Sequence, residues 1–401
     1  MHEERSPRAR VLIAVTVPAF ADVLMRGQFA WLKKRGWDIT LVSSPGPELA
    51  TVARREGVAV EELSMSRYIS LASDLRALWS FISLLRRRRP QLTHVNTPKA
   101  GFIGGLASVL TGVPCRVYTL MGLRLETARG FQRAVLWFTE WVACRCAHVV
   151  IAVSPSLAER AVAVGVVRRR KVLTFGLGSN NGVDAARFIP TPERIAMANR
   201  QRRAWGIVAE APVIGFVGRI VDDKGIKELI EAFQVVRAAR PDAQLLMVGG
   251  IEPGLSATTQ ATLDSPGIVV TNLLEDTNIA HLVIDVLVLP TYREGFPNVP
   301  LEAAAAERPV VTTTATGAVD SVIDGKTGLL VPPGDPDSLA KAILMLIENP
   351  ERARTMGRAG RQWVESEFRQ ERIWQDIENT YVRLLTDRSG RGGLSSTRRS
   401  P

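Results

Sequence analysis

The sequence predicts an α/β protein made of two doubly wound domains, each with a mainly parallel sheet covered by helices on both faces. Three observations predict this class. The chain has 401 residues, which is more than a single hydrophobic core usually serves. Short runs rich in Val, Ile and Leu alternate with helical patterns along most of it. The alternation stops in a stretch rich in Gly, Asn and Pro at 178–195 and then begins again.

Composition and cysteine usage indicate a globular protein of a reducing compartment. Hydrophobic residues make up 46% of the chain and charged residues 23%. Cys115, Cys144 and Cys146 give no disulfide framework, and the C-x-C has no second pair at zinc-ligand spacing. The apolar stretch Val11–Val17 is soon followed by proline and is typical of a first strand rather than of a signal peptide. No run of eighteen apolar residues occurs, so we expect a cytoplasmic protein without a transmembrane helix.

The positive charge is concentrated in the first half of the chain. The net charge is +11, but residues 1–190 carry +14 and residues 191–401 carry −3. Such asymmetry indicates an anionic partner for the first half, such as a membrane surface, a phosphorylated lipid or nucleic acid. A solubilising surface explains any single cluster equally well.

The first half alternates strands with helices. A long helix is predicted over Ser66–Arg89, and it ends in four arginines and a proline stop. Thr97 is expected to cap the next helix, with Pro98 at its first position. The long helix has apolar residues on one face at steps of three and four, namely Leu71, Leu75, Leu78, Ile82 and Leu85. The predicted strands are 10–18, 38–46, 91–97, 116–122 and 148–154, and another helix is predicted over Phe20–Arg35.

The second half repeats the pattern and sets the domain boundaries. Its predicted strands are 213–219, 243–250, 267–272, 282–290 and 310–317, with helices from about 335 to 385. We expect a first domain over 1–190, a second over 191–365, a final helix over 366–386 that returns towards the first domain, and a disordered Gly/Ser/Arg-rich tail over 387–401. Ligands are expected at the carboxyl ends of the strands, in a cleft between the two domains.

The segment FVGRIVDDKGIKELIEAF (216–233) opens the second domain with a polar turn between a strand and a helix. Gly218 ends the strand, and Arg219 and Lys224-Gly225 follow before the helix. Two cations and free backbone N–H groups at this point suit an anion such as a diphosphate. An ordinary capped turn is the alternative.

The segment PTYREGFPNVPLE (290–302) places two carboxylates on either side of a helix start. Gly295 permits close approach of the backbone to a ligand. Glu294 lies before the helix and Glu302 within it, so each can accept hydrogen bonds from a different part of one ligand. A ribose and a hexose joined by a diphosphate meet that description. The alternative is that Glu294 caps the helix and Glu302 faces solvent.

These motifs together resemble glycosyltransferase family 4, the retaining enzymes of the GT-B fold with two Rossmann-like domains. The resemblance rests on the E-x7-E spacing of Glu294 and Glu302, on the GR…KG loop, and on DGKTGLLVPPGDPDSLAKAI (324–343). In the first half, HVNTPKAGFIGG (94–105), YTLMGLRLE (118–126) and GSNNGVDAARF (178–188) are similar to the bacterial branch that builds capsular, exopolysaccharide or O-antigen repeats.

The resemblance implies roles for the residues of the second domain, which would bind the nucleotide-sugar donor. Arg219 and Lys224 would hold the diphosphate and stabilise its charge as it leaves. Glu294 would contact the donor sugar, and Glu302 would bind the ribose. The remaining donor-site residues would act through their backbone or close approach: Gly218, Gly295, Phe296, Asn298 and Val299.

The first domain would bind the acceptor. Many family members carry a histidine where this chain has Met121, and a methionine can act neither as a base nor as a donor. His94 is a substitute, although a structural histidine at a strand end is the favoured interpretation. Lys99, Arg124 and Glu126 complete the acceptor candidates. The segment 130–146 combines aromatic residues with arginines, as a membrane interface or a packed core would.

The resulting hypothesis is a peripheral-membrane glycosyltransferase on the inner face of the cell membrane. It would move a hexose or N-acetylhexosamine from a nucleotide sugar, which the resemblance implies is UDP-linked, to a saccharide on undecaprenyl diphosphate. No cofactor or metal is expected, because Asp335 and Asp337 lie in a turn where capping explains them. A nucleotide-sugar epimerase of the same fold, an inactive family member and a nucleic-acid binder are the alternatives, and the last lacks any recognised binding motif.

Overall fold

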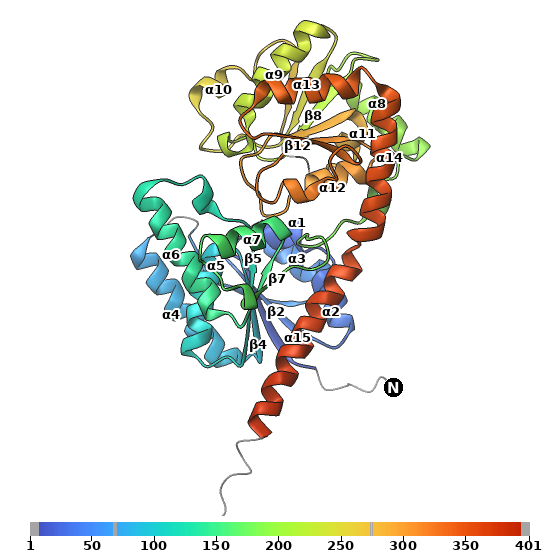
Figure 1. Ribbon diagram of the computed structural model, residues 1–401. Helices are drawn as coiled ribbons and strands as arrows, with labels where there is room; N and C mark the ends of the chain where they lie inside the picture. Colours follow the sequence, from blue (N-terminus) through green and yellow to red (C-terminus); the bar gives the residue numbers. More distant parts are fainter. Residues whose placement is uncertain (1–7, 67–69, 273, 275, 394–401) are drawn as a thin grey trace, which may run out of the picture. The chain divides into compact units, whose positions relative to one another are not determined.

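The chain folds into two compact units. The structure, a computed structural model, describes residues 8–66, 70–272, 274 and 276–393. Unit 1 comprises the chain up to Asn181 and again from Gln370, and unit 2 comprises Gly182–Arg369. The division therefore falls between Asn181 and Gly182, some residues before the predicted boundary at 190. The chain enters unit 1 again through α15 (Gln370–Gly393), which Figure 1 shows as the last helix.

The prediction of a disordered tail over 387–401 is wrong for its first part. Helix α15 continues to Gly393, and residues 394–401 lie outside the described residues. Residues Ile373, Ile377, Tyr381 and Leu384 of α15 are buried in the core of unit 1. Because each added residue of an established helix contributes a further backbone hydrogen bond, the packed part supports the Gly- and Arg-containing turns that follow.

Unit 1 is built on a seven-stranded sheet in the order β3-β2-β1-β4-β5-β6-β7, and every strand pair is parallel. The prediction of a parallel, doubly wound sheet is confirmed. The strands are β1 (Arg10–Ala14), β2 (Asp38–Ser43), β3 (Ala59–Glu62), β4 (Leu92–Asn96), β5 (Cys115–Leu120), β6 (Val149–Ala152) and β7 (Val172–Leu173). The helices besides α15 are α1 (Pro18–Leu24), α2 (Gln28–Lys34), α3 (Pro47–Glu56), α4 (Leu71–Arg88), α5 (Pro98–Leu110), α6 (Gly130–Cys146) and α7 (Pro155–Ala163).

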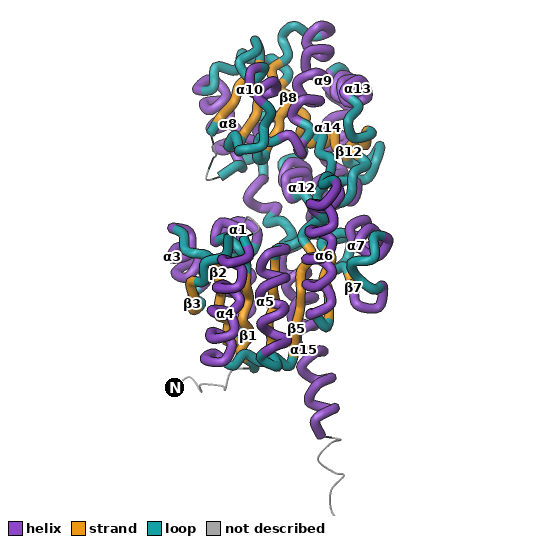
Figure 2. Tube along the Cα trace, turned by 90° about the vertical axis from the view of Figure 1, so that its left-hand side faces the viewer, coloured by secondary structure: helices purple, strands orange, loops and turns teal. Residues whose placement is uncertain are grey.

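Helices cover both faces of this sheet. On one face α1, α2, α3 and α15 form a single apolar core with β1 and β2. On the other face α5 packs between α4 and α6, as Figures 1 and 2 show. The small residues of α5 permit this close packing, because a Cβ on Gly101 would lie 2.6 Å from the ring of Tyr118 and one on Gly104 would lie 2.9 Å from Val95.

The first predicted helix is interrupted. The segment Phe20–Arg35 forms α1 and α2, separated at Gly27, which has a φ of 85°. A Cβ at Gly27 would lie 2.8 Å from the indole of Trp374, so the break fits the packing of α15 against this point. Local periodicity cannot reveal a contact with the far end of the chain.

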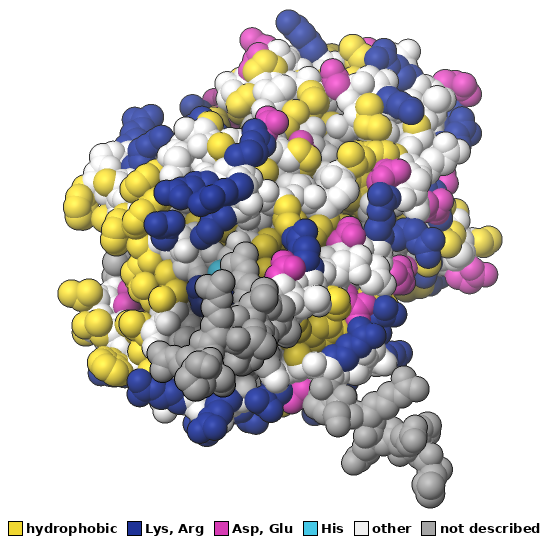
Figure 3. Space-filling view, turned by 60° about the horizontal axis from the view of Figure 1, so that its bottom comes forward, with side chains coloured by type: hydrophobic (Ala, Val, Ile, Leu, Met, Phe, Trp, Pro, Cys, Tyr) yellow, Lys and Arg dark blue, Asp and Glu magenta, His cyan; other side chains and the backbone are white. Residues whose placement is uncertain are grey.

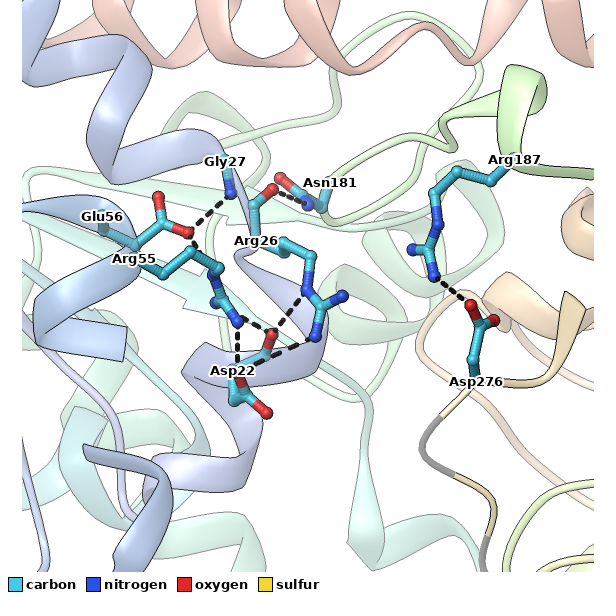
Figure 4. A network of polar contacts seen from close by, with 8 residues as sticks. All are labelled: Asp22, Arg26, Gly27, Arg55, Glu56, Asn181, Arg187 and Asp276. Atoms are coloured by element: carbon cyan, nitrogen blue, oxygen red, sulfur yellow. Dashed lines mark hydrogen bonds and ion pairs between the residues drawn. The ribbon is translucent and has the colours of Figure 1, made fainter. Parts of the chain in front are cut away.

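A polar network holds the interrupted segment in place (Figure 4). Glu56 accepts hydrogen bonds from the backbone N–H of Gly27 at 2.9 Å and of Ala30 at 3.1 Å, and therefore caps α2 from α3. Arg55 donates to Glu56 at 2.8 Å and is paired with Asp22 of α1. Asn181 adds a bond from its amide to Arg26 O at 3.1 Å, which ties the end of unit 1 to the same turn.

Helix α4 starts later than predicted and buries a different face. It begins at Leu71 rather than Ser66, and residues 67–69 lie outside the described residues. Ile82 and Leu85 are buried as predicted, but Leu71 and Leu75 are exposed by 78% and 49%. Ala77, Phe81 and Leu84 are buried with Ile82 and Leu85, so the predicted stripe faces the core only in its second half.

The cap predicted at Thr97 is also different. Thr97 occupies the N-cap position of α5 but makes no side-chain capping bond. Its hydroxyl is instead bonded to that of Thr16 at 2.6 Å, and its φ of 72° is rare for a β-branched residue.

Unit 2 is built on a six-stranded parallel sheet in the order β10-β9-β8-β11-β12-β13. The strands are β8 (Val213–Val217), β9 (Gln244–Val248), β10 (Ile268–Thr271), β11 (Val286–Leu289), β12 (Val310–Thr313) and β13 (Gly328–Val331). The helices are α8 (Pro192–Ala204), α9 (Ile226–Ala239), α10 (Ala257–Ala261), α11 (Asn278–Val283), α12 (Asn298–Ala305), α13 (Pro336–Ile347) and α14 (Pro350–Glu367). Residues of α9 and α13 share one core with β8, β9 and β11.

The strand predicted over 282–290 is shorter than expected. Its first residues belong to α11, and β11 begins only at Val286. Apart from His281 and Asp285 the run HLVIDVLVL is apolar, and a short apolar run does not distinguish a buried helix end from a buried strand. The consequence is functional, because His281 lies on a helix beside the predicted site.

Candidate active site

The polar side chains of unit 2 gather where the strands of its sheet end. The turn after β8 leads through the 3₁₀ turn Asp222–Lys224 into α9, and the turn after β11 leads into α12. β8 and β11 are neighbours in the sheet, so these two turns lie at the same carboxyl edge. That edge is where parallel sheets bind ligands.

Lys224 and Glu294 form the centre of the site. The Lys224 ammonium is hydrogen-bonded and ion-paired with Glu294 Oε1, and the two side chains are only 16% and 13% exposed. The two residues come from different turns, and only the fold brings them together. Because the pair is half-buried, the ammonium and the carboxylate are held in one orientation, in which each can form further hydrogen bonds with a polar ligand.

Close backbone packing fixes the two turns against each other. A Cβ at Gly225 would lie 2.0 Å from Pro290 O, so only glycine fits this close approach of the two backbones. Gly225 also has a φ of 71°, which favours glycine. The Tyr292 N–H donates to Asp223 O at 3.2 Å, and Arg293 is paired with Asp223 Oδ2 at 2.6 Å. Neither Arg293 nor Asp223 was predicted as part of the site.

A third turn supports Glu294 from the other side. The Glu294 N–H donates to Thr316 O at 2.8 Å. A Cβ at the next residue, Gly317, would lie 2.4 Å from Gly295 O and 2.6 Å from Glu294 O. The glycine that follows β12 predicts a turn at this point. The neighbouring sequence does not indicate that the turn packs against the backbone of Glu294 and Gly295.

The start of α12 presents hydrogen-bonding groups without side-chain partners. Its N-cap is Pro297, and no side chain caps the helix. The first N–H groups of a helix have no partner within the helix and carry the positive end of its dipole. The Oδ1 atom of Asn298 is buried and has no hydrogen-bond partner among the described residues. Phe296 is buried and packs on Phe368 with ring centroids 5.5 Å apart.

Glu302 lies on α12 with a buried histidine beside it. The Nε2 atom of His281 is 3.3 Å from Glu302 Oε2, and the Glu302 side chain is 24% exposed. His281 is fully buried and packs on Phe188. The histidine orients one oxygen of the carboxylate. Sequence reasoning missed it because it directly precedes the run 282–290, which was predicted as a strand and whose first residues belong to α11.

Arg219 lies apart from the Lys224–Glu294 pair. Its guanidinium pairs with Glu252 Oε2 at 2.7 Å, and its side chain is 56% exposed. Exposed ion pairs contribute about 0–1 kcal/mol, so this contact leaves the guanidinium able to exchange partners. Gly218, with a φ of 150°, ends β8 immediately before it.

His94 is a structural histidine, as the favoured interpretation held, and not an acceptor-binding substitute for the residue at Met121. Its side chain is buried, its Nδ1 is 2.6 Å from the Tyr381 hydroxyl, and its Nε2 is 2.6 Å from the Thr119 hydroxyl. Burial lowers the pKa of His94 to about 3. A neutral ring with both nitrogens occupied holds α15 against β4 and β5 and is a structural histidine.

The other acceptor candidates lie at the carboxyl edge of the sheet of unit 1. Lys99, in the first turn of α5, is paired with Asp74 of α4 at 2.7 Å. Glu126 lies in the 3₁₀ turn Arg124–Glu126 and is paired with Arg160 of α7 at 3.1 Å, whereas the Arg124 side chain is exposed. Met121, at the end of β5, is half-buried. Their acceptor roles stay predictions.

The described residues contain neither a metal-ligand cluster nor a membrane-spanning helix. Among these residues no group of three His, Cys, Asp or Glu side chains is arranged to hold a metal ion. No helix in the same part of the chain is long and apolar enough to cross a bilayer. Asp335 accepts a hydrogen bond from Ser338 N at 2.9 Å and caps α13, as predicted.

Two parallel-sheet units, with charged and polar groups gathered at strand ends, define a two-domain protein of the Rossmann-like class. Residues 197–363 match the family described as glycosyl transferases group 1, and residues 22–178 match the glycosyl transferase 4-like domain. The chain is 36% identical over 371 residues to the capsular polysaccharide biosynthesis glycosyltransferase CapM of Staphylococcus aureus, covering 92% of this chain and 96% of that protein. It therefore belongs to glycosyltransferase family 4.

Two further comparisons agree with this assignment. The chain is 25% identical over 328 residues to the Escherichia coli UDP-Gal:alpha-D-GlcNAc-diphosphoundecaprenol alpha-1,3-galactosyltransferase, covering 80% of this chain and 83% of that enzyme. The crystal structure of Anabaena Alr3699/HepE in complex with UDP and glucose superposes with a TM-score of 0.79 at 20% identity. The superposition covers 94% of this chain and 100% of the other and shows that the fold is GT-B.

Proposed function

We propose that this glycosyltransferase transfers a hexose or N-acetylhexosamine, with retention, from a UDP-sugar to a lipid-linked saccharide in the synthesis of a bacterial surface polysaccharide. The observation that carries the proposal is the Lys224–Glu294 pair beside the uncapped start of α12. A cation, a carboxylate and free N–H groups at one strand edge match a sugar joined to a diphosphate. The names of the Staphylococcus and Escherichia relatives support the pathway, the UDP base and the lipid diphosphate.

Each polar group of the proposed donor site binds one part of the donor molecule. Lys224 and Arg219 bind the diphosphate, together with the N–H groups of Asn298 and Val299. Glu294 accepts hydrogen bonds from the sugar hydroxyls, and Glu302, oriented by His281, accepts them from the ribose. The orphan Oδ1 of Asn298 is satisfied by a hydroxyl of the donor.

The reaction follows from this placement. The bond between the sugar C1 and the diphosphate oxygen breaks, and a bond from C1 to the acceptor hydroxyl oxygen forms on the same face. The hydroxyl proton passes to the departing diphosphate oxygen. The leaving diphosphate gains negative charge, which Lys224, Arg219 and the α12 dipole stabilise without a metal ion. The acceptor binds at the carboxyl edge of unit 1, near Lys99, Arg124 and Glu126.

A thermal-shift panel tests the donor assignment. We expect UDP and UDP-sugars to raise the melting temperature more than GDP, ADP or their sugars, because a ligand at 100 times its Kd stabilises the native state by about 2.7 kcal/mol. Glu302→Ala and Arg219→Ala should lose this shift. Arg240→Ala is a matched control, because Arg240 also forms an exposed pair, with Asp242 at 3.0 Å. Equal shifts in all variants, or none with any nucleotide in folded protein, would argue against the proposed donor site. A shift without any transfer would indicate the inactive-member alternative.

The proposed membrane contact lies on α4 and α6 of unit 1. Leu71, Leu75 and Trp79 form one exposed stripe of α4, with exposures of 78%, 49% and 66%. Phe131 and Phe138 of α6 are exposed by 85% and 53%, and both helices pack against α5. Exposed arginines accompany them: Arg76, Arg129 and Arg133. Figure 3 shows a face on which hydrophobic side chains lie next to Lys and Arg side chains. Apolar insertion combined with cations suits an anionic bilayer.

Vesicle flotation tests this contact. We expect the protein to float with vesicles containing phosphatidylglycerol, and the Leu71→Ser/Trp79→Ser/Phe131→Ser variant to bind at least 10-fold more weakly, because three large apolar side chains no longer enter the bilayer. Val208→Ser/Val235→Ser changes exposed apolar residues of unit 2 and should bind as the wild type does. Equal binding of both variants would argue against the assigned surface.

A further inference from the structure

A basic pocket lies at the edge of the sheet of unit 1 opposite to the carboxyl ends. Its volume is about 470 Å³. It opens where three neighbouring strands begin, because Arg10, Asp38 and Ala59 are the first residues of β1, β2 and β3 and all three line it. The end of α4 supplies the remaining wall, with Arg87, Arg88, Arg89 and Pro90.

The charges around this pocket do not balance. Among the described residues, four arginines line it and Asp38 is the only carboxylate in the lining. Glu61 of β3 accepts hydrogen bonds from both Arg87 at 2.9 Å and Arg88 at 2.8 Å. Partial burial favours the neutral form of Glu61, but the two guanidiniums hold its pKa below the usual range. Counting Glu61 as well, the pocket keeps an excess of two positive charges.

The helix dipole explains only part of this cluster. Cations at the C-terminus of a helix are favoured by the dipole, which accounts for arginines in the last turn of α4. Arg10 comes from a strand, and its Nε and Nη2 donate to Arg89 O at 3.2 and 3.0 Å, so a second element directs a guanidinium to the same place. Arg89 has a φ of 45°, a conformation for which glycine is the usual choice at the end of a helix. Its guanidinium forms no ion pair with any described residue.

We propose that this pocket binds an anion with several phosphate charges. Guanidinium groups present two parallel N–H donors that match phosphate oxygens, and arginines from two elements, β1 and the end of α4, suit a ligand with more than one phosphate. The pocket is separate from the proposed reaction, because both candidate substrate sites lie at carboxyl edges. It is also distant from the exposed start of α4, since the 18 residues of that helix span about 27 Å. The ligand is a free oligophosphate or a phosphorylated lipid headgroup, which share this chemistry.

Titration calorimetry with inorganic tripolyphosphate at about 0.15 M salt tests the proposal, since nonspecific surface attraction is screened there. We expect Arg10→Gln/Arg89→Gln to weaken binding at least 10-fold relative to the wild type. Arg87→Gln/Arg89→Gln should do the same, and it leaves the Arg10 contact to the Arg89 backbone in place. The Arg219→Gln/Lys224→Gln variant identifies and removes any binding at the proposed donor site. Arg168→Gln/Arg170→Gln, which changes exposed arginines elsewhere in unit 1, should bind as the wild type does.

A second binding experiment, with vesicles containing phosphatidic acid, distinguishes a soluble oligophosphate from a lipid headgroup as the ligand. A loss of tripolyphosphate binding alone in the pocket variants supports a soluble oligophosphate, and a loss of vesicle binding in them supports a lipid headgroup. Unchanged binding of both probes by folded pocket variants would overturn the proposal, as would an equal loss in the Arg168→Gln/Arg170→Gln control.

Discussion

Replacing Lys224 with alanine is expected to lower kcat/KM for sugar transfer by about 10²–10³-fold, the usual effect of removing one group that stabilises charge in the transition state. The substitution removes the cation that we propose binds the leaving diphosphate. It also leaves Glu294, whose side chain is only 13% exposed, without its charged partner. The loss should appear in kcat as well as KM, because the contact strengthens as the diphosphate gains charge.

Steady-state kinetics with the donor that gives the largest thermal shift measure this effect. Lys227→Ala is the matched control, because Lys227 lies on the following helix α9, is 67% exposed and pairs only weakly with Glu231 at 3.8 Å. Lys227→Ala should stay within about twofold of the wild type. If the two variants were equally active, Lys224 would have no part in the reaction. If Lys224→Ala lost transfer but still epimerised the donor, the epimerase alternative would be supported.

The alternation of strands and helices could be predicted because each element is determined locally. Strands of both sheets are short apolar runs, and the turns between them carry glycine or proline. The elements that were missed are less apolar or shorter, such as β3, whose four residues AVEE are only half-buried at most. The division of Phe20–Arg35 at Gly27 also could not be predicted, because the indole that contacts it belongs to Trp374.

In the candidate site, too, features within one continuous segment could be predicted, whereas contacts between residues far apart in the sequence could not. Glu294, Glu302 and the helix start at Asn298 follow from one continuous segment, and the structure places them as that segment predicts. The pair between Lys224 and Glu294 joins residues 70 positions apart, and only the parallel pairing of β8 with β11 makes them neighbours. His281 was missed for a different reason, since an apolar run was assigned the wrong secondary structure.

The acceptor role considered for His94 failed because burial is not visible in a strand-end motif. In the sequence, HVNTPKAGFIGG places the histidine close to a polar turn, where an acceptor would bind. In the structure its ring points to Tyr381 and is enclosed by α15, which comes from the far end of the chain. The favoured interpretation, a structural histidine, was the correct one.

Gly317→Ala is expected to lower the rate of transfer by about 10²-fold while leaving the protein folded. Gly317 has a φ of 76°, and a Cβ there would lie 2.4 Å from Gly295 O and 2.6 Å from Glu294 O. Both contacts are with backbone, so the turn that carries Glu294 must move away. A displacement of about 1 Å in a catalytic group can lower the rate by about 10²-fold. Donor binding should weaken too, because Glu294 and the start of α12 move together.

Gly325→Ala separates this displacement from simple backbone strain. Gly325 has a φ of 70°, and a Cβ there would meet nothing within 4 Å. Both substitutions force alanine into the left-handed region, which costs about 1–2 kcal/mol, so both should lower the melting temperature by several degrees. Only Gly317→Ala should lose activity and the donor-induced thermal shift. Equal activity of the two variants would show that the turn between β12 and β13 does not position Glu294, and that the site tolerates movement where the geometry indicates that it is rigid.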